Sequence, residues 1–466
     1  MFDLVSPHFF VHPKTKKNIK PTTNPSFPAA TQKAETLAME FNAINNQIGK
    51  LMKEKKKDEA VELQEKSKAM KDEIAAARAA TADALAARDA ALSPIGNLVH
   101  ESVPVSSDEK DNVVVRTWGD PGPAKGKKYN HVDLVRLLDI VDLDAGVAAA
   151  GGRGYYLKKE GVLLNQALIQ FAIAHGMAAG AEPVATPFFL NKEIMAETAQ
   201  LSQFDEELYK VSAGSGKDGE DGGENDKYLI ATSEQPLCAL HRARWFDEKD
   251  LPLKYVGYST CFRKEAGSHG RDTLGIFRVH QFEKVEQFTV TSPLNNASWE
   301  ALEEMLSTAE GFYRALNLPY QVVNIVSGEL NNAAAKKYDL EAWFPAGAAF
   351  RELVSCSNCT DYQSRAVEAR LRVPQAPGEA SAEAKREKLY VHMLNCTLAA
   401  TQRTLCCVLE NWQEEDGVRV PDCLRPYMPQ NIEFIPFRKA LDAKGKVVPL
   451  PAPAAASAAA GEEKSR

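Results

Sequence analysis

Between Thr31 and Leu92 the apolar residues recur every three or four positions, which is the spacing of a helix with one buried face. They form two successive seams with a lysine-rich stretch between them. Two seams around a short polar tip predict an antiparallel helical hairpin, whose longer helix would extend roughly 50 Å at about 1.5 Å per residue. A dimerising coiled coil is an alternative that the heptads alone leave open. The seam positions are Leu37, Phe41, Ile44, Ile48, Leu51 and then Leu63, Met70, Ile74, Ala77, Thr81, Leu85.

From Tyr255 to Val290 the pattern changes to the alternation of two long strands joined by a glycine-rich loop. Because every second side chain of a strand shares a surface, Arg278, Phe282 and Glu286 are expected on one face. Arg263 and Glu265 are expected to share a face of the first strand. Such a surface suits a ligand with a phosphate, a flat base and an ammonium group. The alternative is a hairpin whose charged face is merely solvated.

A second polar feature follows the strand-like run that begins at His392. The next residues have helical spacing, and Leu398, Thr401, Leu405, Val408 and Trp412 are expected to face the core. Arg403 lies off that stripe, among small residues, where a guanidinium group needs an anionic partner. From the residues alone this partner is either a ligand or a structural carboxylate.

Composition is that of a globular protein with a large domain and an appendage. The chain has 466 residues, with 44% apolar and 26% charged residues. The net charge of −7 gives no global positive field, so contact with RNA would depend on local basic patches. The eight cysteines show no scaffold spacing and suggest reduced thiols; the single CxxC at Cys356 and Cys359 lacks the further ligands of a zinc site. No apolar run approaches membrane-spanning length, so no membrane partner is expected.

The chain is expected to divide into five parts. Residues 1–30 are rich in Pro and Thr and are expected to be poorly ordered, with a targeting segment as an alternative. Residues 31–95 are expected to form the helical arm, 96–128 a linker and 129–440 the large globular domain. Residues 441–466 are expected to be a disordered tail.

Several of these segments resemble one enzyme family. CFRKE followed by FRVHQFEKVEQF resembles motif 2 of the class II aminoacyl-tRNA synthetases, and HMLNCTLAATQRTLCCVLENWQ resembles motif 3. In detail, over residues 35 to 437, the chain is similar to the seryl-tRNA synthetase family in its eukaryotic cytosolic form. EPVATPFFL resembles motif 1, which implies a homodimer through the region around Pro187. The resemblance implies an α+β fold: an antiparallel coiled-coil hairpin, and a catalytic domain built on an antiparallel β-sheet flanked by helices.

The resemblance also implies roles for single residues. Glu352 and Ser355 would hold Mg²⁺ with ATP, although strict alternation puts them on opposite faces of a strand, so their pairing needs a local bulge or twist. The residues expected to act in catalysis are Arg263, Arg278 and Arg403. ATP would be bound by Arg263, Glu265, Arg278, Val279, Phe282, Glu352, Ser355 and Arg403. Serine would be bound by Thr232, Glu234, Arg263, Glu286, Asn395 and Thr397, and tRNA by Lys53, Lys55, Lys56, Lys57 and Arg271.

The implied activity is ATP-dependent formation of seryl-adenylate from L-serine, followed by transfer of serine to the 3′-terminal adenosine of tRNA(Ser), and of tRNA(Sec) where it occurs. The expected location is the cytoplasm, with organelle import as an alternative. Two other hypotheses remain open. One is a class II paralogue that acts as a non-catalytic binding or regulatory module, and the other is a coiled-coil interaction protein with an idle globular domain.

Overall fold

The structure is a computed structural model that describes residues 9–11, 26–92, 95–121, 129–199, 207–212, 226–265, 274–372 and 389–450. The chain forms two compact units, Met1–Val99 and His100–Arg466. Each unit has its own core. All eight cysteines lie in the described residues, and none of them forms a disulfide.

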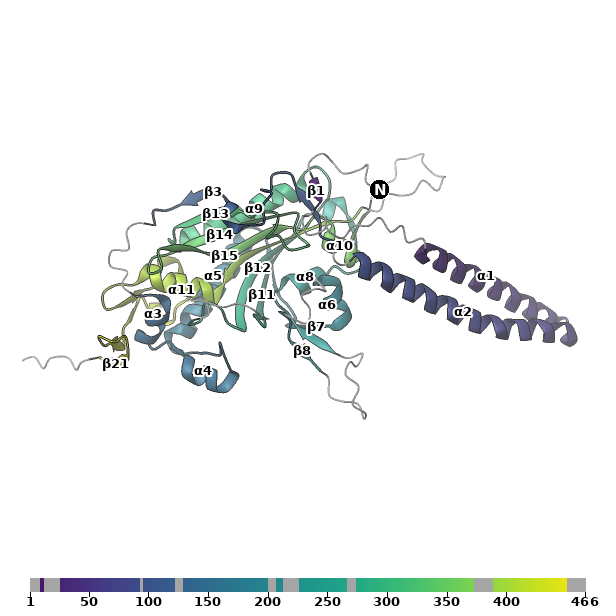
Figure 1. The fold of residues 1–466 in the computed structure, drawn as a ribbon, viewed down its shortest axis with the longest axis horizontal. Coiled ribbons are helices and arrows are strands. Elements are labelled where there is room, and N and C mark those ends of the chain that lie inside the picture. Colours follow the sequence, from purple (N-terminus) through teal and green to yellow (C-terminus); the bar gives the residue numbers. More distant parts are fainter. Residues whose placement is uncertain are drawn as a thin grey trace, which may run out of the picture. The chain divides into compact units, whose positions relative to one another are not determined.

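The first unit contains the predicted hairpin, formed by helices α1 (Ser26–Lys53) and α2 (Lys57–Leu92) (Figure 1). The predicted seams face each other: Ile44, Met70 and Ile74 are buried between the helices. The Ser67 hydroxyl donates to Asn45 Oδ1 across the same interface at 2.9 Å. The turn lies at Glu54–Lys56, so the predicted lysines occupy the exposed tip. The helix begins at Ser26, and the expectation of poor order is therefore wrong for the last residues of segment 1–30.

Within the described residues of the second unit, eight strands form one sheet in the order β3-β13-β14-β15-β17-β12-β11-β6. Neighbouring strands are antiparallel except β6 and β11, which are parallel. The predicted antiparallel fold is thus confirmed. The strands are β3 (Val113–Trp118), β6 (Glu182–Ala185), β11 (Leu253–Phe262), β12 (Gln281–Thr291), β13 (Tyr320–Asn324), β14 (Lys336–Phe344), β15 (Ala349–Asn358) and β17 (His392–Ala400).

Helices α5 (Glu160–Ala178), α9 (Ala297–Ala315) and α11 (Thr401–Trp412) join the sheet in the main hydrophobic core (Figure 1). Alternation on β12 shows which face they cover. Gln287 donates to the Met305 carbonyl of α9 at 3.0 Å, so Glu286 and its even-numbered neighbours point to the opposite face. The centre of that second face is left for polar groups.

Two β-bulges change the alternation beside this polar region. In the pairing of β14 with β15, Leu340 is opposite Val354 and Glu341 is opposite Glu352, so Leu353 is an extra residue. In the pairing of β12 with β17, Leu398 is extra in the same way. A bulge switches the face on which the following side chains lie. The local irregularity that Glu352 and Ser355 require is therefore present.

The domain boundaries differ from the expectation at both ends. Strand β3 belongs to the large sheet, so the predicted linker 96–128 contributes structure to the catalytic unit. Residues 439–449 form a hairpin of β20 (Lys439–Leu441) and β21 (Val447–Pro449), so the expected disordered tail is wrong for its first part. Residues 451–466 lie outside the described residues.

Helix α5 is long and apolar enough to cross a membrane by length and composition, contrary to the expectation from the sequence. Its residues Leu164, Leu168 and Ala172 are completely buried in the main core. A buried core helix of a folded domain can have the same length and apolar composition as a membrane-spanning helix.

The remaining α-helices and strands of the described residues belong to the second unit, except β1, which lies in the first unit, and β2, whose residues cross the boundary between the two. They are β1 (Phe9–Val11), β2 (Leu98–His100), α3 (His131–Leu137), β4 (Val141–Asp142), α4 (Leu143–Ala150), β5 (Tyr156–Leu157), β7 (Phe189–Asn191), α6 (Lys192–Thr198), β8 (Lys210–Val211), β9 (Lys227–Leu229), α8 (Glu234–Ala239), β10 (Trp245–Asp247), α10 (Tyr362–Ala366), β16 (Arg370–Arg372), β18 (Gly417–Arg419) and β19 (Phe434–Pro436).

Candidate active site

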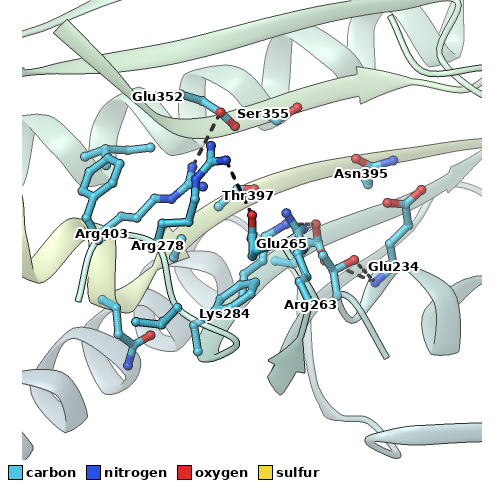
Figure 2. Close-up of a pocket in the computed structure, with 18 of the residues that line it drawn as sticks. Glu234, Arg263, Glu265, Arg278, Lys284, Glu352, Ser355, Asn395, Thr397 and Arg403 are labelled. Atoms are coloured by element: carbon cyan, nitrogen blue, oxygen red, sulfur yellow. Dashed lines mark hydrogen bonds and ion pairs between the residues drawn. The ribbon is translucent and has the colours of Figure 1, made fainter. Parts of the chain in front are cut away.

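A cavity of about 220 Å³ lies on the sheet face opposite α5 and α9. All the adenylation-site residues predicted from the sequence line it, although they are spread from position 232 to position 403. They are Thr232, Glu234, Arg263, Glu265, Arg278, Val279, Phe282, Glu286, Glu352, Ser355, Asn395, Thr397 and Arg403. Figure 2 shows most of the charged members directed toward one another from β12, β15, β17 and the segments beside them.

Arg263 and Arg278, which flank the two strands β11 and β12, reach the cavity from outside those strands. Strand β11 ends at Phe262 and β12 begins at Gln281, so the prediction that Arg263, Glu265 and Arg278 lie on strand faces is wrong. Glu265 has a left-handed backbone with φ of 50°. Arg278 Nη1 lies 3.6 Å from Glu265 Oε2. The chain leaves β11 after Phe262 and enters β12 only at Gln281. The backbone outside the two strands therefore directs these three side chains into the cavity.

His280 fixes the backbone of Arg263. The Arg263 amide donates to the His280 carbonyl at 2.9 Å, and His280 Nδ1 lies 2.9 Å from the Arg263 carbonyl. The Arg263 guanidinium then lies over the Phe282 ring, 5.3 Å from its centroid. This arrangement gives His280 a structural role.

The bulge at Leu353 brings Glu352 and Ser355 to the same cavity wall. Arg403, from the first turn of α11, points to this wall, and its Nη1 lies 3.6 Å from Glu352 Oε2 (Figure 2). The enclosing protein opposes ionisation of Glu352, but Arg403, Lys337 and other cations outweigh that effect and lower its pKa. Phe277 stacks below Arg403, 5.3 Å from its guanidinium carbon. The anionic partner of Arg403 in this structure is thus a carboxylate.

The other end of the cavity is built around Glu286, whose side chain is 1% exposed. Lys284 Nζ lies 2.5 Å from Glu286 Oε1. The Ser233 hydroxyl and the Glu234 amide donate to Oε2 at 3.0 and 3.2 Å. Gly257 of β11 lies directly beside this contact, because a Cβ there would be 3.1 Å from Ser233 Oγ. Glu286 is therefore a fully partnered carboxylate in the floor of the cavity.

Glu234, the first residue of α8, is only partly buried and faces the cavity. Burial and repulsion by Glu286 raise its pKa to about 7, against the opposing influence of Lys284, Gln363 and Arg263. Thr232 accepts a bond from the Glu234 amide at 3.2 Å. This end of the cavity can accept a cationic group more strongly as Glu234 ionises.

Asn395 and Thr397 of β17 are buried beside Glu286, and the Asn395 amide contacts Cys359 Sγ at 3.6 Å. Both side chains precede the bulge at Leu398, and Ala400 lines the cavity after it. The bulge keeps the polar pair and the start of α11 on one wall.

Several cavity residues were missed in the sequence. Lys284 had a usable signal, because it alternates with Phe282 and Glu286 on one strand. Asn331 and Ser357 had no such signal. Asn331 lies in a loop, and Ser357 lies in β15, a strand interpreted only through the family resemblance. The other unpredicted lining residues are Phe277, Leu353, Ala400 and Gln402.

The predicted tRNA contacts lie elsewhere. Lys53, Lys55, Lys56 and Lys57 are exposed at the tip of the helical hairpin. Arg271 lies outside the described residues. Pro187 follows edge strand β6 and is exposed, together with Phe188 and Phe189.

The cavity combines two chemistries. One end holds three arginines and a phenyl ring, which suits a phosphorylated ligand with a flat base. The other end holds two carboxylates with buried hydroxyl and amide groups, which suits a small polar ammonium compound. The two ligands would meet near Arg263.

Comparisons with known proteins agree with this geometry. Residues 209–412 match the model of the tRNA synthetase class II core domain (G, H, P, S and T). The chain is 53% identical over 420 residues to the cytoplasmic serine–tRNA ligase of Arabidopsis thaliana, covering 88% of each protein. It is 56% identical over 394 residues to the serine–tRNA ligase of Helianthus annuus, covering 84% of this chain and 86% of that protein.

Solved structures give the same result. The cytoplasmic serine–tRNA ligase from Naegleria fowleri in complex with AMP has a TM-score of 0.69 and 46% identity. The seryl-tRNA synthetase from Pyrococcus horikoshii complexed with ATP has a TM-score of 0.70 and 38% identity. Each comparison covers 88% of this chain and 91% of the other.

Proposed function

The chain belongs to the seryl-tRNA synthetase family of class II aminoacyl-tRNA synthetases, and from this premise we propose that its cavity is where serine and ATP form seryl-adenylate. The chain is an ATP-using ligase that joins serine to tRNA. The observation that carries the assignment of the site is the convergence of a cationic, ring-bearing end and an acidic, hydroxyl-bearing end in one cavity.

The cationic end binds ATP in this proposal. Phe282 stacks the adenine, Glu265 accepts from its amino group, and Val279 supplies an apolar contact. Arg278 and Arg403 bind the outer phosphates, and Arg263 binds the α-phosphate. The pairs Arg278–Glu265 and Arg403–Glu352 support this assignment, because each arginine is neutralised until phosphate oxygens replace the carboxylate.

Glu352 and Ser355 are the residues that would hold Mg²⁺ with ATP. Both are hard oxygen donors on one wall, which suits Mg²⁺, and Mg²⁺ commonly takes one or two protein ligands together with phosphates and water. No cluster of three acidic, His or Cys residues suited to a metal occurs among the described residues, so the phosphates would complete the coordination. When bound, the ion would neutralise charge that develops on the phosphates.

The acidic end selects serine. Glu234 receives the ammonium group and Glu286 the hydroxyl group, with Thr232, Asn395 and Thr397 as further polar partners. A site built to bond a hydroxyl rejects alanine, because its buried polar groups would be left unpaired. Threonine must be rejected by lack of space, because one extra methyl group changes binding little in an adequate pocket.

The reaction then needs positioning and positive charge. The serine carboxylate attacks the α-phosphorus, and pyrophosphate leaves. Arg263 lies where both anions would meet, so it reduces their repulsion and stabilises the negative charge that develops there. The ribose hydroxyl of the terminal tRNA adenosine attacks the carbonyl carbon of the resulting mixed anhydride, so the seryl group forms an ester with the ribose and AMP leaves.

The helical hairpin would bind tRNA(Ser), and tRNA(Sec) where it occurs. Its exposed tip carries Lys53, Lys55, Lys56 and Lys57, which can neutralise backbone phosphates.

The exposed aromatic residues Phe188 and Phe189 beside Pro187 support a homodimer through the surface around Pro187. The relatives from Arabidopsis thaliana and Dictyostelium discoideum are named cytoplasmic, which supports that location.

Amino-acid-dependent ATP–pyrophosphate exchange tests the proposal. We expect exchange with serine and none with alanine, threonine or glycine. A chain that binds tRNA but gives no exchange with any amino acid would instead be the non-catalytic paralogue.

A further inference from the structure

Gln363 lies behind the serine end of the cavity and is not one of its lining residues. It is 4% exposed, and its Nε2 donates to Glu234 Oε1 at 2.7 Å. Among the described residues, it is the side chain that donates to the Glu234 carboxylate. Glu234 and Gln363 are separated by 129 positions, so the contact exists only in the folded unit.

Gln363 is fixed in place by the strand that carries Asn395 and Thr397. It belongs to α10, whose Ser364 hydroxyl donates to the Val391 carbonyl at 2.6 Å. Just before α10, the Cys359 amide donates to the Met393 carbonyl at 3.0 Å. Glu234 is therefore anchored to the same framework as the other predicted serine contacts.

Glu234 needs such a donor more than Glu286 does. Glu286 is partnered by Lys284, by the Ser233 hydroxyl and by a backbone amide. Glu234 is faced by Glu286, Lys284, Arg263, Cys238 and Cys359, and within the described part of the chain only Gln363 donates a hydrogen bond to its carboxylate. Burial and Glu286 raise the pKa of Glu234 to about 7, and the Gln363 donor favours the ionised form.

A purely structural role fits Gln363 poorly. Its Oε1 is buried and has no hydrogen-bond partner among the residues that the structure describes. Leaving such an acceptor unpaired destabilises a fold relative to an apolar side chain of the same shape. The hydrogen bond from Nε2 to Glu234 is the interaction that offsets this cost.

We propose that Gln363 is a positioning residue that holds the Glu234 carboxylate toward the serine ammonium group and thereby strengthens serine binding. The inference rests on the proposed assignment of the serine end. Glu234 contacts the substrate, and Gln363 acts through Glu234.

The test is Gln363→Met, which keeps an unbranched side chain of similar length and removes the donor. Exchange is measured with varied serine and varied ATP from about pH 6 to about pH 9, the range in which a group with a pKa near 7 titrates. Without the donor, the pKa of Glu234 rises, so a higher pH is needed to ionise Glu234 and to lower the serine KM. We expect the midpoint of the pH dependence of the serine KM to move up by about one unit. The ionised fraction of Glu234 at pH 7 then falls from about one half to about one eleventh, so the serine KM at pH 7 should rise about fivefold. The ATP KM should not change.

Two comparisons separate positioning from a general structural effect. Gln413→Met removes another buried amide, which bonds Tyr129 away from the cavity, and should leave the pH profile of serine KM unchanged. In a Glu234→Gln background, Gln363→Met should have no further effect on serine KM. Should Gln363→Met fail to fold, Gln363→Asn withdraws the donor by one methylene and should shift the profile in the same direction.

An unchanged serine profile in Gln363→Met, an equal rise in the KM for ATP, or a full additional effect in the Glu234→Gln background would overturn the inference. Loss of serine-dependent exchange in the wild-type chain would instead overturn the proposed function.

Discussion

Replacing Lys284 with methionine leaves the Glu286 carboxylate buried without its cation. Lys284 Nζ lies 2.5 Å from Glu286 Oε1, and the two side chains are 9% and 1% exposed. The Ser233 hydroxyl and a backbone amide would remain as the only direct donors among the described residues. Nearby Glu234 adds repulsion to the unpaired charge.

The expected loss of stability follows from this burial. Removing one partner of a buried ion pair costs about 3 to 5 kcal/mol, because the remaining charge stays out of water. The second unit contains roughly 370 residues. With an unfolding entropy of about 2.1 cal/mol/K per residue, a loss of 4 kcal/mol lowers Tm by about 5 °C. Replacing both residues, as in Lys284→Met with Glu286→Gln, should recover most of that loss, since no buried charge remains.

Calorimetric melting and serine-dependent exchange together provide the assay. The single variant should melt lower and lose exchange, while the double variant should regain stability but not exchange. Lys254→Met is a matched control, because Lys254 also lies 2.5 Å from a carboxylate, that of Glu304, but on the surface. Such exposed pairs contribute about 0 to 1 kcal/mol. A single variant as stable as wild type, or a double variant no more stable than the single one, would refute the reasoning.

Three further outcomes are expected. Arg403→Met should lower kcat/KM for ATP by about 10²-fold, because it removes a positive charge that would face the phosphates. The melting temperature of this variant should barely change, since the partner Glu352 is 48% exposed. A normal ATP dependence would contradict the assigned role. Deletion of residues 26–92 should leave exchange intact and reduce charging of tRNA with labelled serine, whereas unchanged charging would disprove the role of the hairpin. Asp139→Asn should destabilise the protein by about 1 to 2 kcal/mol at pH 7, because three lysines around Asp139 lower its pKa. That contribution exists above the ordinary pKa of about 4 and is lost as the pH falls below it, so the melting curves of wild type and variant should converge in acid.

Periodicity predicted the parts of the fold that repeat regularly. The helical seam around Ile44 and Ile74 and the shared face of Phe282 and Glu286 follow directly from spacing, and both are confirmed. Arg263 and Arg278 do line the same cavity, but they do so from turns beyond the strand ends. Alternation could not locate those ends, because the sequence on either side is equally compatible with a strand.

Other features depend on tertiary structure that no local pattern encodes. Leu353 is an ordinary strand residue in the sequence, so its bulge could be anticipated only from the need to bring Glu352 and Ser355 together. The contact of Gln363 with Glu234 joins two short helices, α10 and α8, that are 129 positions apart, and neither segment indicates the other. Resemblance to a family supplied residues predicted to contact substrates more readily than residues that position them, such as Gln363.

The bulge at Leu353 makes part of the enzyme's chemistry depend on strand register as well as residue type. If Leu353 entered the ladder with β14 as a regular strand residue, Glu352 and Ser355 would be three alternating positions apart, and one of them would turn toward the helix-covered side. A descendant could therefore retain every acidic and hydroxyl group of this wall and still lose the donor pair.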